Sequence, residues 1–141
     1  MRHEAARFPY PLGVHGDGLV RGACPGRRRE VGHAAPVIRI SLGTFDSDKA
    51  AIVETKLVES KAALETGIRA MRGNLGYYVG IDRRNNAISN VSLWDSVEAA
   101  EQMATFRPML DLATTFVALG VQFQRPILNL ATLWEFPRAN N

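Results

Sequence analysis

The chain has 141 residues, of which 46% are hydrophobic and 22% are charged, a composition typical of a single globular domain. No apolar run approaches the roughly 20 residues that a membrane-spanning helix needs, so we expect no membrane partner. The net charge of +3 belongs to residues 1–36, which hold six Arg against three acidic residues, whereas residues 37–141 hold eleven of each sign. A domain without net charge is a poor ligand for nucleic acid, which is therefore an unlikely partner.

Residues 1–36 differ in composition from the rest of the chain. They contain six Gly, four Pro and no helical or strand periodicity, so they lack the apolar surface needed to offset the entropy of ordering. We predict a disordered basic leader here, or a start assigned too far upstream. No apolar stretch of the kind found in a secretory signal follows the basic residues, and we expect a cytoplasmic protein.

The next segment predicts a strand followed by a helix. Residues 37–45 alternate, with isoleucine and leucine on one face and polar residues on the other. Asp46 and the polar residues after it supply N-cap chemistry for an amphipathic helix over residues 48–71. We expect Gly67 to break this helix into two pieces.

Residues 75–81 and 87–94 predict a hairpin of two strands. Between them Asn85 and Asn86 can take the positive φ values of a two-residue turn. The second strand leads directly into Asp95, which we expect to cap the next helix.

That second helix is predicted over residues 96–119, with an interruption near Pro108, because proline cannot donate a hydrogen bond to the preceding turn. A last strand region over residues 121–136 is expected in two segments, since Pro126 is confined to an edge or a bulge. Residues 137–141 are assigned as a C-terminal tail.

The element order is β-α-β-β-α-β, which predicts an α+β, ferredoxin-like domain over residues 37–136. Its four-stranded antiparallel sheet would carry both helices on one face. Because apolar residues also point away from the helices, we expect a second copy of the chain to cover the open face, giving a homodimer that is a dimeric α/β barrel.

Two short motifs carry a family resemblance. The strand GYYVGID starts at Gly76, and WDSVEAA follows from Trp94 at the strand-to-helix junction. Together with the element order, they resemble the dimeric α/β-barrel superfamily and, within it, the antibiotic-biosynthesis monooxygenase family. The resemblance covers about residues 37–136. It implies oxygenation of a small electron-rich aromatic substrate without any cofactor.

The candidate site residues lie on the strands. Asn90 and Trp94 are four residues apart and share a face, and they resemble an Asn and Trp that hold the substrate and steer oxygen in quinone-forming members of that family. We therefore assign Asn90 and Trp94 to catalysis, with packing at the end of the core as the alternative for Trp94. Arg39, Tyr78 and Ser92 are assigned to substrate binding.

Residues 37–141 contain no His and no Cys, so we expect no metal site, no haem ligand and no Cys-His or Ser-His-Asp nucleophile in the domain. Two functions stay open. One is the cofactor-free monooxygenase, and the other is a barrel that binds a small apolar or aromatic molecule without catalysis, as in stress-response proteins. A third, weaker alternative is nucleic-acid binding through the basic leader.

Overall fold

The computed structural model describes residues 35–136. The predicted leader, apart from residues 35 and 36, and the predicted tail at 137–141 lie outside the described residues. Within this part of the chain, no helix is both long enough and apolar enough to span a membrane.

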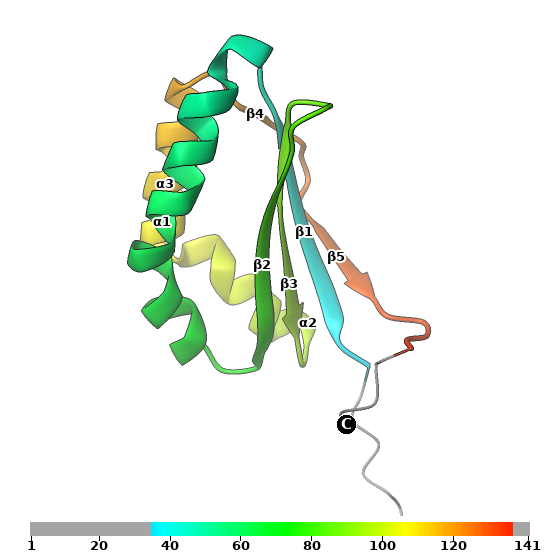
Figure 1. The fold of residues 1–141 in the computed structure, drawn as a ribbon. Coiled ribbons are helices and arrows are strands. Elements are labelled where there is room, and N and C mark those ends of the chain that lie inside the picture. The colour runs from blue at the N-terminus through cyan, green and yellow to red at the C-terminus, as the bar shows by residue number, and fades with distance from the viewer. Residues whose placement is uncertain (1–34, 137–141) are drawn as a thin grey trace, which may run out of the picture. The chain divides into compact units, whose positions relative to one another are not determined.

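A single antiparallel sheet forms one layer (Figure 1). Its strands are β1 (Val37–Thr44), β2 (Asn74–Asp82), β3 (Ala87–Trp94), β4 (Gln122–Phe123) and β5 (Leu128–Ala131). β3 lies between β2 and β1, while β4 and β5 pair with opposite ends of β1 and together form the other edge. The last strand is therefore split in two, as the sequence predicts.

The helices form the second layer, on one face of this sheet (Figure 1). They are η1 (Ser47–Lys49), α1 (Ala50–Ala70), α2 (Val97–Glu101), η2 (Gln102–Thr105) and α3 (Arg107–Ala118). The α+β, ferredoxin-like prediction is confirmed.

α1 is continuous, so the predicted break at Gly67 is wrong. A Cβ placed on Gly67 would lie 2.5 Å from Cζ of Phe106. Glycine is present because the ring of Phe106 packs directly against the α1 backbone. The sequence pattern cannot distinguish this close packing from a helix break.

The β2–β3 turn also differs from the prediction. Asp82 pairs with Ala87, so four residues connect the strands rather than two. The Asp82 carboxylate accepts hydrogen bonds from the backbone N–H groups of Arg84 and Asn85, each at 3.1 Å. Among the described non-glycine residues only Asn86, with φ of 50°, is left-handed. The aspartate side chain therefore organises a longer turn.

The second helical region is capped by Ser96, not by Asp95 as predicted. The Ser96 hydroxyl accepts a hydrogen bond from the Ala99 N–H at 3.1 Å. The predicted interruption near Pro108 is confirmed: α2 and η2 end before Phe106, and Pro108 lies in the first turn of α3, where its missing N–H is not needed.

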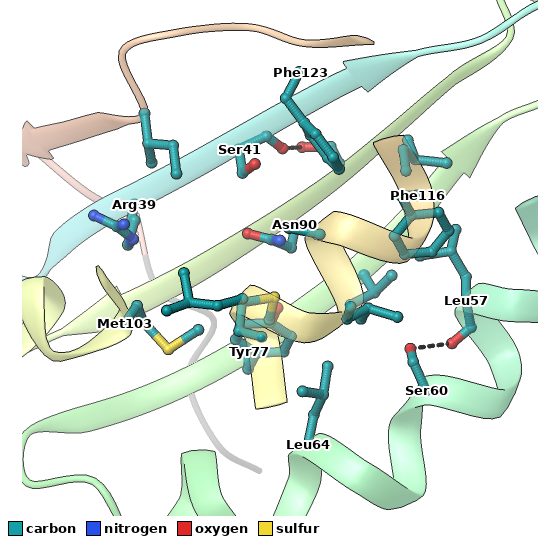
Figure 2. Close-up of a pocket in the computed structure, with 18 of the residues that line it drawn as sticks. Arg39, Ser41, Leu57, Ser60, Leu64, Tyr77, Asn90, Met103, Phe116 and Phe123 are labelled. Atoms are coloured by element: carbon teal, nitrogen blue, oxygen red, sulfur yellow. Dashed lines mark hydrogen bonds between the residues drawn. The ribbon is translucent and has the colours of Figure 1, made fainter. Parts of the chain in front are cut away.

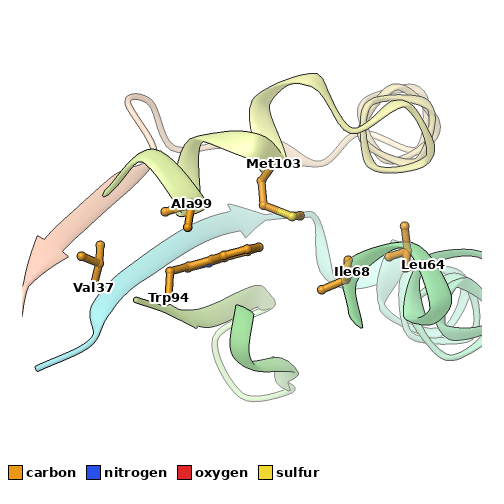
Figure 3. Close-up of a cluster of buried hydrophobic side chains, with 7 residues drawn as sticks. Val37, Leu64, Ile68, Trp94, Ala99 and Met103 are labelled. Atoms are coloured by element: carbon orange, nitrogen blue, oxygen red, sulfur yellow. The ribbon is translucent and has the colours of Figure 1, made fainter. Parts of the chain in front are cut away.

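Two buried clusters, at opposite ends of the sheet, hold the sheet and the helices together. Trp94 is the largest member of the first cluster and packs beside α2 (Figure 3). The members of this first cluster are Val37, Leu64, Ile68, Trp94, Ala99, Ala100 and Met103. The second cluster comprises Phe45, Val53, Ile88, Phe116 and Val121.

The outer face of the sheet is not covered by any described segment (Figure 1). The strand register places Ile38, Ile40, Val91, Leu128 and Leu130 on this face. Two of them, Leu128 and Leu130, are exposed. The sequence-based expectation that both faces of the sheet carry apolar residues is confirmed.

Candidate functional site

A cavity of about 260 Å³ lies between the sheet and the helices, in the middle of the strands (Figure 2). β1, β2 and β3 form its floor, and α1, η2 and α3 form its walls. It lies between the two buried clusters, so each end of the fold closes around its own core while the centre stays open.

The strand pairing arranges the floor in rows. Arg39, Ser92 and Tyr77 form one row across β1, β3 and β2, because Ser92 pairs with both of the others. The next row holds Ser41, Asn90 and Val79. Residues paired across strands share a face, so these six side chains point toward the helices.

Small residues leave the room for the cavity. Ser41 is a small residue on the cavity floor, whereas its neighbours on the other face of β1 are the larger isoleucine and leucine. Gly43 is the next inward position, and a Cβ there would lie 3.0 Å from the Phe123 ring and 2.8 Å from Val121. Phe123 can therefore lie across the β1 backbone at one end of the cavity (Figure 2).

The walls are apolar. Ser60 is the one hydroxyl that α1 contributes, and it donates to the Leu57 carbonyl at 2.7 Å, so it offers the cavity little free hydrogen-bonding capacity (Figure 2). The remaining wall residues are mostly aliphatic, thioether or aromatic: Leu57, Leu64, Met103, Ala104, Met109, Leu110, Leu112, Ala113 and Phe116.

Arg39 brings a positive charge into this apolar space. It is 9% exposed, and its Nη1 donates to Asn129 Oδ1 on β5 at 2.9 Å. Burial lowers the pKa of the Arg39 guanidinium from its ordinary value, and the positive charge of Arg125 lowers it further. The group stays protonated at neutral pH because arginine starts from so high a pKa.

Tyr77 supplies a hydroxyl without a partner. Its Oη is fully buried, and it makes no hydrogen bond to any described residue. Burial raises the pKa of the Tyr77 phenol, with the charge of Arg39 opposing this rise. Tyr77 is thus a neutral donor in the cavity, and a buried unpaired hydroxyl of this kind costs about 1–3 kcal/mol of stability.

The charged side chains among the described residues that line the cavity are all positive. Arg125 also lines it, near the side chain of Phe123, with its guanidinium carbon 5.8 Å from the ring centre. Among the described residues that line the cavity, none is an aspartate or a glutamate. The arrangement favours a ligand that is mainly apolar and carries negative charge at one end.

The structure brings together two of the sequence-predicted site residues, Asn90 and Arg39. Both line the cavity, in neighbouring rows of its floor (Figure 2). Tyr77, Arg125 and Ser41 line it with them, and none of these three was assigned from the sequence.

Trp94 and Ser92 are on the expected face but do not line the cavity. Trp94 is 0% exposed, and its indole N–H donates to Ser92 Oγ at 2.8 Å. Same-face residues four apart on a strand are separated by about 13 Å, so Asn90 reaches the cavity while Trp94 lies in the first buried cluster. Neither Trp94 nor Ser92 is therefore among the residues that line the cavity with Asn90, and their roles in catalysis and substrate binding stay predictions.

Tyr78 lies on the outer face of the sheet and is 62% exposed. It pairs with Val91, so it points away from Asn90. Tyr78 therefore does not line the cavity, whereas Tyr77 does, and the assignment of Tyr78 to substrate binding stays a prediction. Neighbouring residues on a strand point to opposite faces, but the sequence alone does not indicate which of the two tyrosines faces the helices.

No cluster of three or more His, Cys, Asp or Glu side chains in residues 35–136 is placed to hold a metal ion. The chemistry available in the cavity is therefore that of two guanidinium groups, a phenol, an amide and hydroxyls.

No family model matches the chain, and no curated protein matches its sequence. Solved structures do match its fold. A proposed antibiotic biosynthesis monooxygenase from Deinococcus radiodurans is 21% identical, with 74% of this chain and 96% of that chain covered and a TM-score of 0.51. SnoaB, a cofactor-independent oxygenase from Streptomyces nogalater, is 16% identical over 74% of this chain and all of that chain, with a TM-score of 0.53. A protein from Mycobacterium tuberculosis is 19% identical over 72% of this chain and 98% of that chain, with a TM-score of 0.53.

These likenesses establish the fold. The chain has the ferredoxin-like α/β fold of proteins that resemble antibiotic biosynthesis monooxygenases, as the sequence motifs lead one to expect. At identities of 16–21% the fold does not carry an activity with it, so function has to be argued from the cavity.

Proposed function

We propose that this protein is a cofactor-free oxygenase that binds a small electron-rich aromatic molecule in the cavity. The observation that carries the proposal is the combination of Arg39, Tyr77 and Asn90 on the floor of an apolar cavity whose described lining has no acidic residue. A volume of about 260 Å³ is below the roughly 300–1,000 Å³ of pockets for drug-sized ligands, so one or two fused rings suit it best.

The reaction needs no electrons from outside the substrate. A phenol with an open para position reacts with O2 to give a quinone and water. One oxygen atom enters the ring, and the other leaves as water with the phenolic hydrogen and the para hydrogen. The substrate supplies all four electrons, and the protein has only to favour the electron-rich phenolate and hold it in place.

Arg39 can favour the phenolate. A positive charge close to a bound phenol lowers the pKa of that phenol, and the low polarity of the walls strengthens the effect. The neutral Tyr77 hydroxyl can donate a hydrogen bond to the same oxygen. The Asn90 amide lies one row away on the floor and can donate a hydrogen bond to the reacting O2 as negative charge develops on it.

The described lining offers no carboxylate or imidazole to accept the phenolic proton. The proton therefore passes to solvent. We expect activity to increase with pH up to the pKa of the bound substrate, and to level off above it.

The alternative is a barrel that binds a small ligand and does not catalyse. The position of Trp94 favours it, because an indole that is fully buried and bonded to Ser92 cannot contact oxygen or substrate in the cavity. Both functions use the same cavity, so binding alone does not separate them.

Oxygen consumption by the full chain separates the two. We would measure uptake with 1-naphthol, anthrone and small hydroquinones, together with the product mass. Protein-dependent uptake that falls at least tenfold in Asn90→Ala and in Arg39→Met supports the oxygenase. Binding of these compounds without uptake or product supports the alternative. Tyr77→Phe and Tyr78→Phe form a matched pair on opposite faces of β2, and only the first should change uptake.

We also propose that a second copy of the chain covers the outer face of the sheet. Leu128 and Leu130 are exposed there beside the partly buried Ile38, Ile40 and Val91, and apolar surface of this kind is usually covered. Light scattering should give twice the chain mass. Leu128→Lys combined with Leu130→Lys should give a monomer, and a monomeric unmodified chain would refute the pairing.

A further inference from the structure

The cavity is lined by two cations, Arg39 and Arg125, which is more positive charge than a single phenolate oxygen needs. Arg39 is 9% exposed and bonds only to a neutral amide, that of Asn129, in the described part of the chain. A buried guanidinium is normally paired with a carboxylate, because removing its charge from water is costly. Here no ion pair to Arg39 exists among residues 35–136.

Arg125 adds a second positive charge rather than a compensating one. It lines the same cavity and lies close enough to Arg39 to disfavour its protonated form. The carboxylate of Glu101 opposes this lowering of the Arg39 pKa, but Glu101 does not line the cavity. An anion entering this space would therefore meet two guanidinium groups and no like charge.

Tyr77 provides a third feature that points to the same end of the ligand. The Tyr77 side chain lines the cavity from β2 while Arg39 lines it from β1, and the Tyr77 hydroxyl is buried without a partner among the described residues. Ser92, which pairs with both, is small and lies between them on β3. Arg39 and Tyr77 thus line the cavity from the two strands that flank β3.

A single phenolate oxygen does not match donors placed on both sides of β3 as well as a carboxylate does. A carboxylate has two oxygens with about four acceptor positions, and arginine binds such planar groups through parallel N–H bonds. It is also ionised at neutral pH without any contribution from the protein. The Asn90 row lies about 7 Å further along the strands, roughly one substituted ring away.

We propose that the ligand is a hydroxylated aromatic carboxylate. Its carboxylate, in place of a phenolate oxygen, is held by Arg39 and Tyr77, and its hydroxylated ring lies beside Asn90. The identity of the hydroxylated ring as substrate rests on the proposed oxygenase function. The carboxylate site does not, because it follows from the unpaired cation and the unpaired hydroxyl alone.

The test compares two probes of nearly the same size, one with a charged carboxylate and one with a neutral amide in its place. 1-Naphthoate and 1-naphthamide have nearly the same shape, and neither is a phenol, so neither depends on oxygenation. Their affinities for the full chain would be measured by calorimetry, for the unmodified protein and for Arg39→Met, Tyr77→Phe and Arg84→Met. Arg84 lies on the exposed β2–β3 turn and is the matched control for loss of an arginine.

We expect 1-naphthoate to bind at least tenfold more tightly than 1-naphthamide. Arg39→Met and Tyr77→Phe should each weaken 1-naphthoate at least fivefold and change 1-naphthamide less than twofold, while Arg84→Met should change neither. Tyr77→Phe is informative even if Arg39→Met fails to fold, because removing an unpaired hydroxyl should not lower stability.

Equal affinities for the two probes, or an equal loss of both in the variants, would overturn the carboxylate site, as would failure of 1-naphthoate to bind. The oxygenase proposal is tested separately by oxygen uptake with 5-hydroxy-1-naphthoate, in which the position para to the hydroxyl is open, and with 1-naphthol. Selective binding of 1-naphthoate without uptake of oxygen by either phenol leaves the carboxylate site standing and removes the oxygenase. Equal uptake with both phenols and no preference for 1-naphthoate removes the carboxylate site and leaves the oxygenase proposal standing.

Discussion

Trp94→Phe separates a structural role for this residue from a catalytic one. The indole is 0% exposed in the first buried cluster, and it donates to Ser92 Oγ at 2.8 Å. Phenylalanine buries roughly 50 Å² less surface, worth about 1.3 kcal/mol. It leaves a space of about 40 Å³, which adds about 1 kcal/mol, and the Ser92 hydroxyl loses its donor at a further cost of about 1 kcal/mol. We expect a loss of about 3 kcal/mol in the free energy of unfolding, or a fall in Tm on the order of 10–20 °C.

The assay is thermal and urea unfolding of the variant, followed by ligand affinity and oxygen uptake at a temperature where it is fully folded. Because Trp94 does not line the cavity, affinity and uptake per folded molecule should stay within about threefold of the unmodified protein. A variant that unfolds like the unmodified protein but loses uptake would refute this reasoning. It would return Trp94 to the catalytic role that the sequence resemblance assigns to it.

Four further changes test individual contacts. Gly67→Ala should lower the free energy of unfolding by about 1 kcal/mol, because contact with Phe106 outweighs the gain in helix propensity, and an unchanged or raised Tm would contradict that packing. Ser96→Ala should cost about 1 kcal/mol through loss of the helix cap, measured by urea unfolding, and no loss would show that the hydroxyl does not cap α2. The Tyr77 phenol has its pKa raised by burial, so the stability it contributes is complete below its unfolded pKa of about 10 and is lost as pH rises beyond that. Unfolding from pH 9 to 11 should show this fall, and Tyr77→Phe should remove part of it, whereas an identical profile in the variant would contradict the assignment. Ser41→Leu should fill the cavity, raise Tm and abolish binding of 1-naphthoate, and a variant that still binds would place the ligand elsewhere.

Much of the fold follows from the sequence because strand alternation and helix periodicity report burial directly. Residues 37–45 alternate because one face of β1 meets the helices, and Pro126 splits the last strand because it cannot donate to the ladder. The errors are local. Asp95 and Ser96 are both good caps, and only the direction of the chain leaving β3 decides that Ser96 is used.

Gly67 shows why some features could not be read from local sequence. Glycine within a helix pattern indicates either a break or a close contact, and the contact here is with Phe106, almost forty residues away. The turn after Asp82 is similar, because an aspartate side chain that accepts three hydrogen bonds makes four residues more favourable than two.

For the candidate site, the sequence predicts only the face of the sheet on which each residue lies. Alternation correctly places Asn90, Trp94 and Ser92 on one face of β3, and pairing adds Arg39 to it. Alternation does not predict which residue along the strand reaches the cavity, because that depends on where helices from later in the chain cross the sheet. That is why Asn90 reaches the cavity and Trp94 does not.

The middle of the sheet is the part of this fold that packing alone does not explain. At both ends, large apolar residues close the space between the layers, as stability requires. Between them the floor carries Ser41, an unpaired Tyr77 hydroxyl and a cation, Arg39, each of which is less favourable for folding than an aliphatic residue would be. Strain and unpaired polar groups of this kind persist where they serve binding or chemistry. The two cores hold the layers together without help from the centre, so the centre is free to hold a ligand that pairs the groups left unpaired.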